Sequence, residues 1–204
     1  MAIATTDRKS EVEIAPYGVT ALKPEVPEVP EVKGARIWAV LRISIGWVFL
    51  WSFLDKLFAL GFTTGRAESG AIDFFGPAAW INGGSPTEGF LQFGVHTKGF
   101  LVDFYQGLAG GAWVDWVFML SLLFIGLGLI FGIATRLAAI GGIVWMAILY
   151  SASAVWPEHN PFMDEHVIYA IVLAGVAYVG AGRYFGFGRW WEQTALVKRA
   201  PFLK

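Results

Sequence analysis

Four long apolar stretches constrain the fold of this chain most strongly. They run roughly over residues 36–60, 113–134, 136–156 and 161–182. Each has the length of about twenty residues at which a helix crosses a hydrocarbon core of ~30 Å. Only 15% of the chain is charged, whereas soluble domains are about 25% charged. We therefore predict an all-α membrane protein built as a four-transmembrane-helix bundle.

The remaining sequence suggests three regions. Residues 1–34 are polar and end in a Pro-Glu-Val repeat, typical of a stiff solvated spacer, although it could also dock a soluble partner. Residues 35–192 form the predicted membrane domain, and residues 193–204 a basic cytoplasmic tail. Such an apolar chain implies the lipid bilayer as its main surroundings.

The connection over residues 61–112 is rich in glycine and aromatic residues. About fifty residues of this composition are unlike a plain solvent loop. We expect an outer cap of short amphipathic segments lying on the membrane face. Within it, residues 99–108 are helix-like, with Phe100, Leu101, Phe104 and Tyr105 on one side.

The distribution of Lys and Arg predicts the orientation in the membrane. One side receives Lys33, Arg36, Arg136 and the basic residues that follow the fourth stretch, from Arg183 to Lys204. Lys56, Arg66 and Lys98 are spread along the other side. By the positive-inside rule both termini are cytoplasmic. Residues 61–112 and 157–160, with all three histidines, then lie outside.

The first stretch has one polar helical stripe. At 100° per residue, Arg42, Gly46, Phe49, Ser52, Phe53 and Lys56 share a face. A face with charges and small residues should meet other helices. Arg42 is shallow enough that we expect it to reach toward the near headgroups.

The segment Asn160–His166 crowds three ionisable groups together. Asn160 and Pro161 predict a helix start, which places Asp164, Glu165 and His166 in its second turn. Ionisable groups at a membrane edge indicate either a functional site or a solvated loop with a capping Asn and interfacial acids. We expect Lys56 and Asp164 to approach one another, either as a structural ion pair or as a pair that also contacts substrate.

Two further groups of residues could form a site. Metal-ligating side chains occur at Glu158, His159, Asp164 and His166, but their spacing matches no defined motif, so we predict no metal. An aromatic set on the outer side could bind a flat headgroup such as a quinone, or could be interfacial packing. This set comprises Trp47, Trp51, Trp80, Phe90, Phe93 and Trp156.

Several function classes find no support in the sequence. The chain has no cysteine, so thiol catalysis and iron–sulfur ligation by its own thiolates are excluded. It also has no phosphate-cradling glycine loop, nucleotide fingerprint or serine-hydrolase elbow. A basic aromatic patch is missing, and we predict no nucleic-acid partner.

The first stretch, from Leu41-Arg42 to Asp55-Lys56-Leu57, resembles the DoxX/DoxD-like membrane family. So do Trp80-Ile81-Asn82-Gly83-Gly84, the Asn160–His166 segment and Gly180-Ala181-Gly182-Arg183-Tyr184. The resemblance covers roughly residues 36–192. The Trp-x-Phe-Leu-Asp-Lys and Trp-Ile-Asn-Gly-Gly segments are similar to the DoxD branch, which is associated with the large membrane subunit of thiosulfate:quinone oxidoreductase.

This resemblance implies a four-helix membrane bundle in a bacterial or archaeal cell membrane. It also implies a quinone as electron acceptor, an outward-facing donor such as thiosulfate, and a second oxidoreductase subunit, which is not recognisable here. A homo-oligomer is also compatible with the sequence. The alternatives are a non-catalytic scaffold for a redox partner and a carrier of small solutes.

Within this reading, four residues are the predicted catalytic set. Lys56 holds an anionic substrate or a quinol oxyanion, Asp164 orients Lys56, and His166 or Asp55 relays protons. Trp51, Trp80 and Trp156 are the predicted quinone-binding residues.

Overall fold

The computed structural model describes residues 33–97, 99–154, 157 and 160–203. These residues form helices and loops with one isolated bridge, Arg66–Ile72, and no strand. The long helices are α1 (Ala35–Phe58), α3 (Ala112–Phe131), α4 (Thr135–Leu149) and α5 (Glu165–Tyr178). The predicted all-α membrane class is confirmed.

Within the described part of the chain, three helices are long and apolar enough to cross a membrane. They are α1, α3 and α4 together with the turn that follows it, as Thr135–Ala152. That turn is η3 (Tyr150–Ala154), a π-helical continuation of α4. α5 is apolar but has 14 residues, about 21 Å of helix, which is shorter than the predicted fourth span.

Short elements make up the rest of the described chain. Residues 61–111, called the cap below, contain η1 (Trp80–Asn82), η2 (Phe90–Gly94) and α2 (Val102–Gln106). Tyr105 of α2 is buried, whereas Phe104 and the preceding Phe100 are exposed. The rings of Phe104 and Tyr105 pack edge-on, with their centroids 5.3 Å apart. After α5 come η4 (Ala181–Arg183), α6 (Gly188–Gln193), α7 (Ala195–Arg199) and η5 (Pro201–Leu203).

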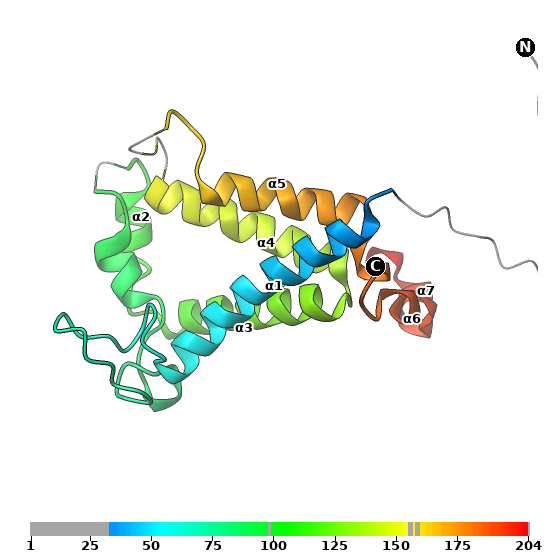
Figure 1. Cartoon of the computed structure of the whole chain (residues 1–204). Helices are drawn as coiled ribbons and strands as arrows, with labels where there is room; N and C mark the ends of the chain where they lie inside the picture. Colours follow the sequence, from blue (N-terminus) through cyan, green and yellow to red (C-terminus); the bar gives the residue numbers. More distant parts are fainter. Residues whose placement is uncertain (1–32, 98, 155–156, 158–159, 204) are drawn as a thin grey trace, which may run out of the picture. The chain divides into compact units, whose positions relative to one another are not determined.

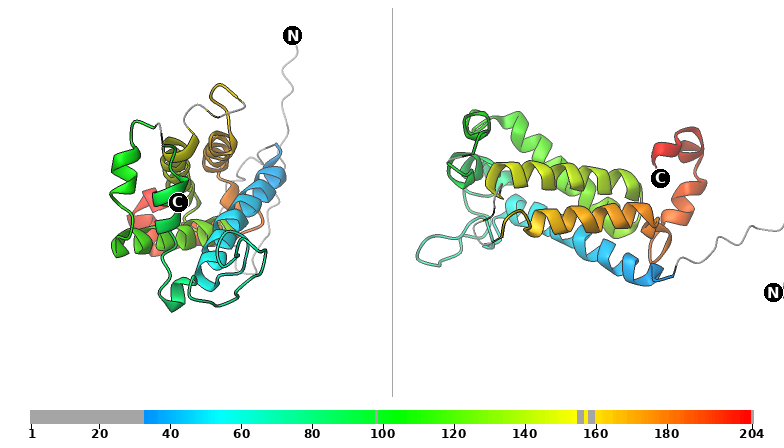
Figure 2. Two further views of the ribbon diagram at one scale, coloured as in Figure 1. Left: turned by 90° about the vertical axis from the view of Figure 1, so that its left-hand side faces the viewer. Right: turned by 90° about the horizontal axis from the view of Figure 1, so that it is seen from above.

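The long helices are arranged as two pairs within residues 32–204. α1 packs on α3, and α4 packs on α5. The pairs meet near α6 and α7 and diverge toward the cap, where α2 lies between their ends (Figures 1 and 2). The bundle therefore has a narrow end and a wide end, which we call the cap end.

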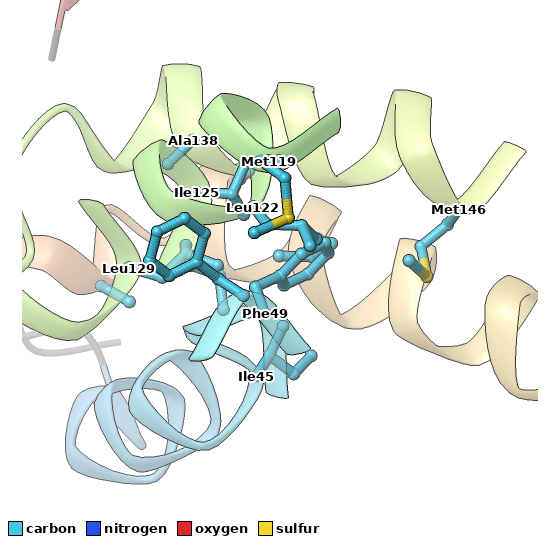
Figure 3. Packing of buried hydrophobic residues seen from close by; sticks show 13 residues of the cluster. Ile45, Phe49, Met119, Leu122, Ile125, Leu129, Ala138 and Met146 are labelled. Carbon is cyan, nitrogen blue, oxygen red and sulfur yellow. The ribbon is translucent and has the colours of Figure 1, made fainter. Parts of the chain in front are cut away.

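Small residues allow close packing at the narrow end. A Cβ on Gly46 of α1 would lie 2.9 Å from the Leu129 Cβ of α3, and one on Gly126 would lie 2.8 Å from the Leu50 backbone. Small residues let membrane helices approach in this way. The apolar core is centred on Phe49, Met119 and Ile125 (Figure 3).

Arg42 is completely buried, which corrects the expectation that it reaches the headgroups. Its Nη1 donates to the Leu129 carbonyl (2.7 Å), and its Nη2 donates to the carbonyls of Tyr184 (3.1 Å) and Phe185 (2.9 Å). The last carbonyls of a helix have no intrahelical donor. Arg42 supplies such a donor to the Leu129 carbonyl near the end of α3. Its side chain is therefore directed into the bundle and away from the headgroups.

Candidate functional site

A cavity of about 1000 Å³ lies in the cap half of the bundle. All four long helices and the cap contribute to its wall. Binding sites for small molecules are typically ~300–1,000 Å³, mostly apolar, with a few convergent polar groups. The position follows from the fold, because the helix pairs diverge here.

Aromatic side chains form much of the cavity wall. They are Phe49, Phe90, Phe104, Tyr105, Trp113, Phe118, Trp145 and Tyr169. Of the three tryptophans predicted to bind a quinone, Trp51 and Trp80 do not line the cavity, and Trp156 lies outside the described residues. Trp51 instead packs on Trp47 and Phe62, and Trp80 packs edge-on against Trp116.

Lys56 lines the cavity from the last turn of α1. Its Nζ donates to the hydroxyl of Thr63 (3.1 Å) and lies 5.9 Å from the centroid of the Phe118 ring. That hydroxyl donates in turn to Asp55 Oδ2 (2.6 Å). Because an ammonium has three N–H donors, two remain for a ligand in the cavity.

Asp55 is almost completely buried and does not line the cavity. Its carboxylate accepts from the backbone N–H of Phe62 (3.0 Å) and of Thr63 (2.8 Å), besides the Thr63 hydroxyl. These bonds fix the loop after α1. Asp55 therefore holds Thr63 in the position where it meets Lys56, and a relay role for Asp55 stays a prediction.

His166 lines the cavity from the first turn of α5, and Asp164 orients it. The distance from His166 Nδ1 to Asp164 Oδ2 is 2.6 Å. An ionised Asp164 accepts a hydrogen bond from Nδ1–H of His166. In the neutral imidazole Nε2 then carries no proton and is an acceptor. Such a His can take up a proton at Nε2 while the carboxylate stabilises the resulting cation.

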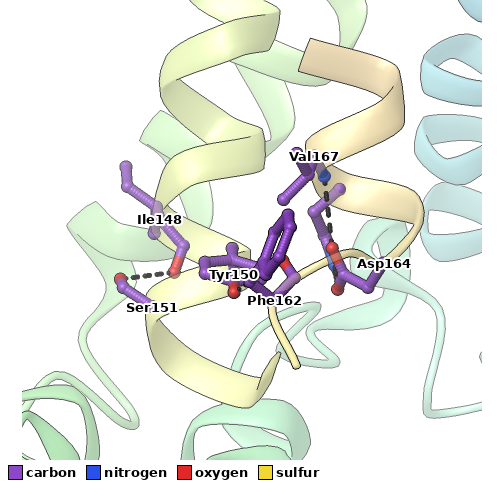
Figure 4. A network of polar contacts seen from close by, with 7 residues as sticks. Ile148, Tyr150, Ser151, Phe162, Asp164 and Val167 are labelled. Atoms are coloured by element: carbon purple, nitrogen blue, oxygen red, sulfur yellow. Dashed lines mark hydrogen bonds and ion pairs between the residues drawn. The ribbon is translucent and has the colours of Figure 1, made fainter. Parts of the chain in front are cut away.

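Asp164 is also the N-cap of α5, and this corrects the predicted helix start. Its Oδ1 accepts from the Val167 backbone N–H at 3.2 Å (Figure 4). Asn160 instead accepts from Phe162 N and Met163 N in a turn before the helix. Asp164, Glu165 and His166 consequently lie at the start of α5, one turn earlier in the helix than predicted.

Lys56 and Asp164 do not form the expected direct ion pair. Within the described residues, the ion pairs are Asp164–His166 and Arg183–Glu192. Asp164 engages its own helix, and Lys56 engages Thr63. The structure therefore brings Lys56 and His166 to one cavity while keeping Asp164 behind the His166 ring.

Asp115 is a buried carboxylate that the sequence reasoning missed. It lies in the first turn of α3, and its Oδ1 accepts from the hydroxyls of Ser85 (2.9 Å) and Thr87 (2.6 Å). Both hydroxyl residues line the cavity. The sequence offered part of this signal, because an acid in the first turn of a helix is favoured by the helix dipole. It did not indicate that Ser85 and Thr87 would be the partners of that acid.

A second polar contact joins the cap to α4. The hydroxyls of Tyr105 and Ser151 are 2.6 Å apart, and Ser151 donates to the Ile148 carbonyl (2.8 Å). Ser151 belongs to the π-helical turn, a distortion that is frequent at functional sites. Tyr150 from the same turn donates to the Phe162 carbonyl (2.9 Å), which ties α4 to the entry of α5 (Figure 4).

The structure describes only part of the set of possible metal ligands that the sequence suggested. Glu158 and His159 lie outside the described residues. Ligand atoms of Asp164, Glu165 and His166 lie within 4.8 Å of one another. However, the Asp164 and His166 atoms already satisfy each other, so the geometry is accounted for without an ion.

Fold and cavity define a multi-pass α-helical membrane protein with an aromatic and polar cavity in one half of its bundle. The family model of DoxX matches residues 37–154, more than half of the chain. The chain belongs to the DoxX family. Comparison with curated proteins and with solved structures gave no match. The matched range contains Lys56, Thr63 and Asp115 but ends before Asp164 and His166.

Proposed function

We propose that this protein is the membrane subunit of a quinone-linked oxidoreductase, with the quinone headgroup bound in the cavity. The observation that carries the proposal is the placement of Lys56 and His166 on one aromatic-lined cavity within the membrane domain. A quinone is flat and apolar, and its carbonyls accept hydrogen bonds. The cavity offers both kinds of contact.

The polar groups suit the charge and proton changes of quinone reduction. Two electrons and two protons convert a quinone to a quinol, and negative charge develops on oxygen when electrons arrive first. The Lys56 ammonium, which makes no ion pair among the described residues, would stabilise that oxyanion. His166, oriented by Asp164, would first take up a proton at Nε2 and then pass it to the quinone oxygen, returning to the neutral imidazole.

The electron donor we propose is thiosulfate or a related small sulfur anion. Without cysteine the chain offers no thiol for a covalent sulfur intermediate, so the donor would be held by charge and hydrogen bonds. Lys56 lies beside the cap and Arg66 lies within it. Their positive charges would hold the anionic donor. A second subunit would then supply the remaining chemistry.

The test uses the purified full chain in detergent with decylubiquinone, following the tryptophan fluorescence that Trp113 and Trp145 give from the cavity wall. We expect saturable quenching. Losing a hydrogen bond from a charged group costs about 1.5–3 kcal/mol, so Lys56→Met and His166→Gln should each weaken binding roughly tenfold or more. Lys198→Met removes an exposed charge outside the cavity and serves as the control.

Equal quinone affinity in wild type, Lys56→Met and His166→Gln would refute this assignment. The large apolar lining also suits a second candidate, a carrier of small apolar or sulfur solutes. Solute exchange by the protein in liposomes, with no quinone-dependent electron transfer, would favour the carrier. A scaffold would retain a stoichiometric protein partner and leave decylubiquinone unbound.

A further inference from the structure

A second, smaller pocket lies at the narrow end of the bundle, away from the cavity. Its volume is about 100 Å³, more than one water requires and enough for a tetrahedral oxyanion. Its wall includes Thr135 and Arg136 at the start of α4, and Gly182, Arg183 and Glu192 from the chain after α5. Nothing in the proposed redox function uses this pocket.

Positive charge predominates among these side chains. Arg136 is exposed at the second position of α4, and Arg183 is half-buried. The Arg183 Nε donates to both carboxylate oxygens of Glu192, at 2.9 and 3.1 Å. These bonds raise the pKa of Arg183 and leave its terminal amino groups for a ligand. Two arginines against one glutamate give the pocket a net charge of +1.

The start of α4 adds donors to the same pocket. α4 has 15 residues, and its N-cap, Ala134, makes no side-chain cap hydrogen bond. The first backbone N–H groups of a helix have no intrahelical acceptor, and the helix dipole favours an anion there. An anion in the pocket would accept hydrogen bonds from these N–H groups.

Thr135 provides an independent indication of a ligand. The residue is only 6% exposed, and its Oγ1 is buried without a hydrogen-bond partner in the described structure. The hydroxyl packs against Gly182, another residue of the pocket wall, so closely that a Cβ on Gly182 would overlap it. A buried hydroxyl without an acceptor is unfavourable, and a bound oxyanion would supply that acceptor.

The position in the membrane indicates which anions reach this pocket. α3 ends at Phe131 and α4 begins at Thr135, so the pocket lies at the boundary of two spans. Phosphates of lipid headgroups lie at that level, and basic pockets between transmembrane helices bind them. A soluble phosphate could reach the same position from the aqueous side.

We propose that this pocket binds a phosphate group, through Thr135 Oγ1, the α4 N-terminus, Arg136 and Arg183. The favoured source is the headgroup of an anionic phospholipid. This proposal is independent of the redox function, because the pocket and the cavity share no residue.

The experiment measures lipid retention by the full chain with native mass spectrometry, after exchange into detergent with equal phosphatidylglycerol and phosphatidylcholine. We expect preferential retention of phosphatidylglycerol. Arg136→Gln should lower it about tenfold, as expected for loss of a charged hydrogen bond. Arg189→Gln is the matched control, because Arg189 lies in α6 at the same end, outside the pocket, against the Tyr184 ring.

Thr135→Val separates a ligand contact from a structural one. Valine keeps the side-chain shape and removes a hydroxyl that has no protein partner, so lipid-free thermal stability should be unchanged or higher. Phosphatidylglycerol retention should nevertheless fall. A loss of stability in the lipid-free protein would mean that the hydroxyl serves the fold, and would overturn the role given to Thr135.

A parallel arm titrates inorganic phosphate against the same variants, following thermal stability. Stabilisation by millimolar phosphate that disappears in Arg136→Gln, without lipid preference, would identify a soluble phosphate as the ligand. Retention of phosphatidylglycerol without a phosphate effect would identify the headgroup. If neither probe distinguishes wild type from Arg136→Gln, the pocket is not a phosphate site.

Discussion

Replacing Arg42 by methionine should destabilise the bundle strongly, although Arg42 lines neither the cavity nor the smaller pocket described above. Among the described residues, Arg42 is the largest completely buried side chain. It joins α1 to the end of α3 and to the turn at residues 184–185. Methionine can fill part of the space but donates no hydrogen bond. Three carbonyl oxygens would lose their short contacts with the guanidinium.

The size of the effect follows from two opposing contributions. Three hydrogen bonds from a charged donor at about 2 kcal/mol each give about 6 kcal/mol. On the insertion scale, an arginine at the centre of a membrane span costs about 3 kcal/mol, and removing the guanidinium recovers this amount. We therefore expect a net loss of about 3 kcal/mol in the free energy of unfolding. Arg42→Lys keeps the charge but cannot bridge both groups of carbonyls, so it should lose about half as much.

The measurement is the free energy of unfolding in mixed detergent micelles, from a denaturant titration followed by tryptophan fluorescence. Arg36→Met is the matched control, because Arg36 is exposed near the start of the same helix. If Arg42→Met unfolds at the same denaturant concentration as Arg36→Met, Arg42 reaches solvent or headgroups after all. The packing described for the narrow end would then be wrong.

Three further outcomes are expected. Asp115→Ala leaves two hydroxyl donors without their acceptor and should cost about 2–4 kcal/mol of stability, whereas the Ser85→Ala, Asp115→Ala double variant should be less than additive. Lys56→Met and Asp164→Asn share no hydrogen-bond partner, so their effects on stability should add within about 0.5 kcal/mol; strong coupling in the double variant would restore the ion pair predicted from sequence. Because the chain has no cysteine, Glu68→Cys should react with an impermeant maleimide in intact cells and Gln193→Cys should not; the reverse pattern would contradict the orientation predicted from the Lys and Arg distribution.

The periodicity of the first stretch predicted a helix face correctly, but not the partner of each side chain. Arg42, Gly46, Phe49 and Phe53 are all buried against other helices, as the stripe indicated. Spacing along one helix cannot reveal which carbonyls approach from helices far away in sequence. For Arg42 these carbonyls belong to residues more than eighty positions away, and they decide that the side chain points inward.

Local competition explains the error at the start of α5. Asn160 and Pro161 form a good helix-start signal, but Asp164 is an equally good cap four residues later. Asp164 gains a second partner in His166, whereas Asn160 satisfies nearby N–H groups in a turn. A single sequence offers both caps, and the contact with His166 favours the later one. The same contact removes Asp164 from Lys56.

The size of side chains along the helices explains why a cavity forms at one end only. Several of the glycines that meet neighbouring helices lie away from the cap. Examples are Gly46 and Gly126 between α1 and α3, and Gly142 against Leu173 of α5. In the cap half, the helices carry Trp113, Phe118, Trp145 and Tyr169 instead.

Helices that are in contact through glycine at one end and through large rings at the other must diverge. Figure 1 shows this divergence in the course of the helix pairs toward the cap. A membrane anchor would gain packing energy from small residues along the whole length of its helices. It would therefore be less stable with an open cavity at one end. The rings keep the pairs apart, and Lys56 and His166 lie in the space between them. This gradient therefore favours a bound ligand over a simple scaffold, and its test is direct. Replacing Trp145 by alanine should weaken decylubiquinone binding, whereas Trp47→Ala, on an exposed face of α1, should leave it unchanged.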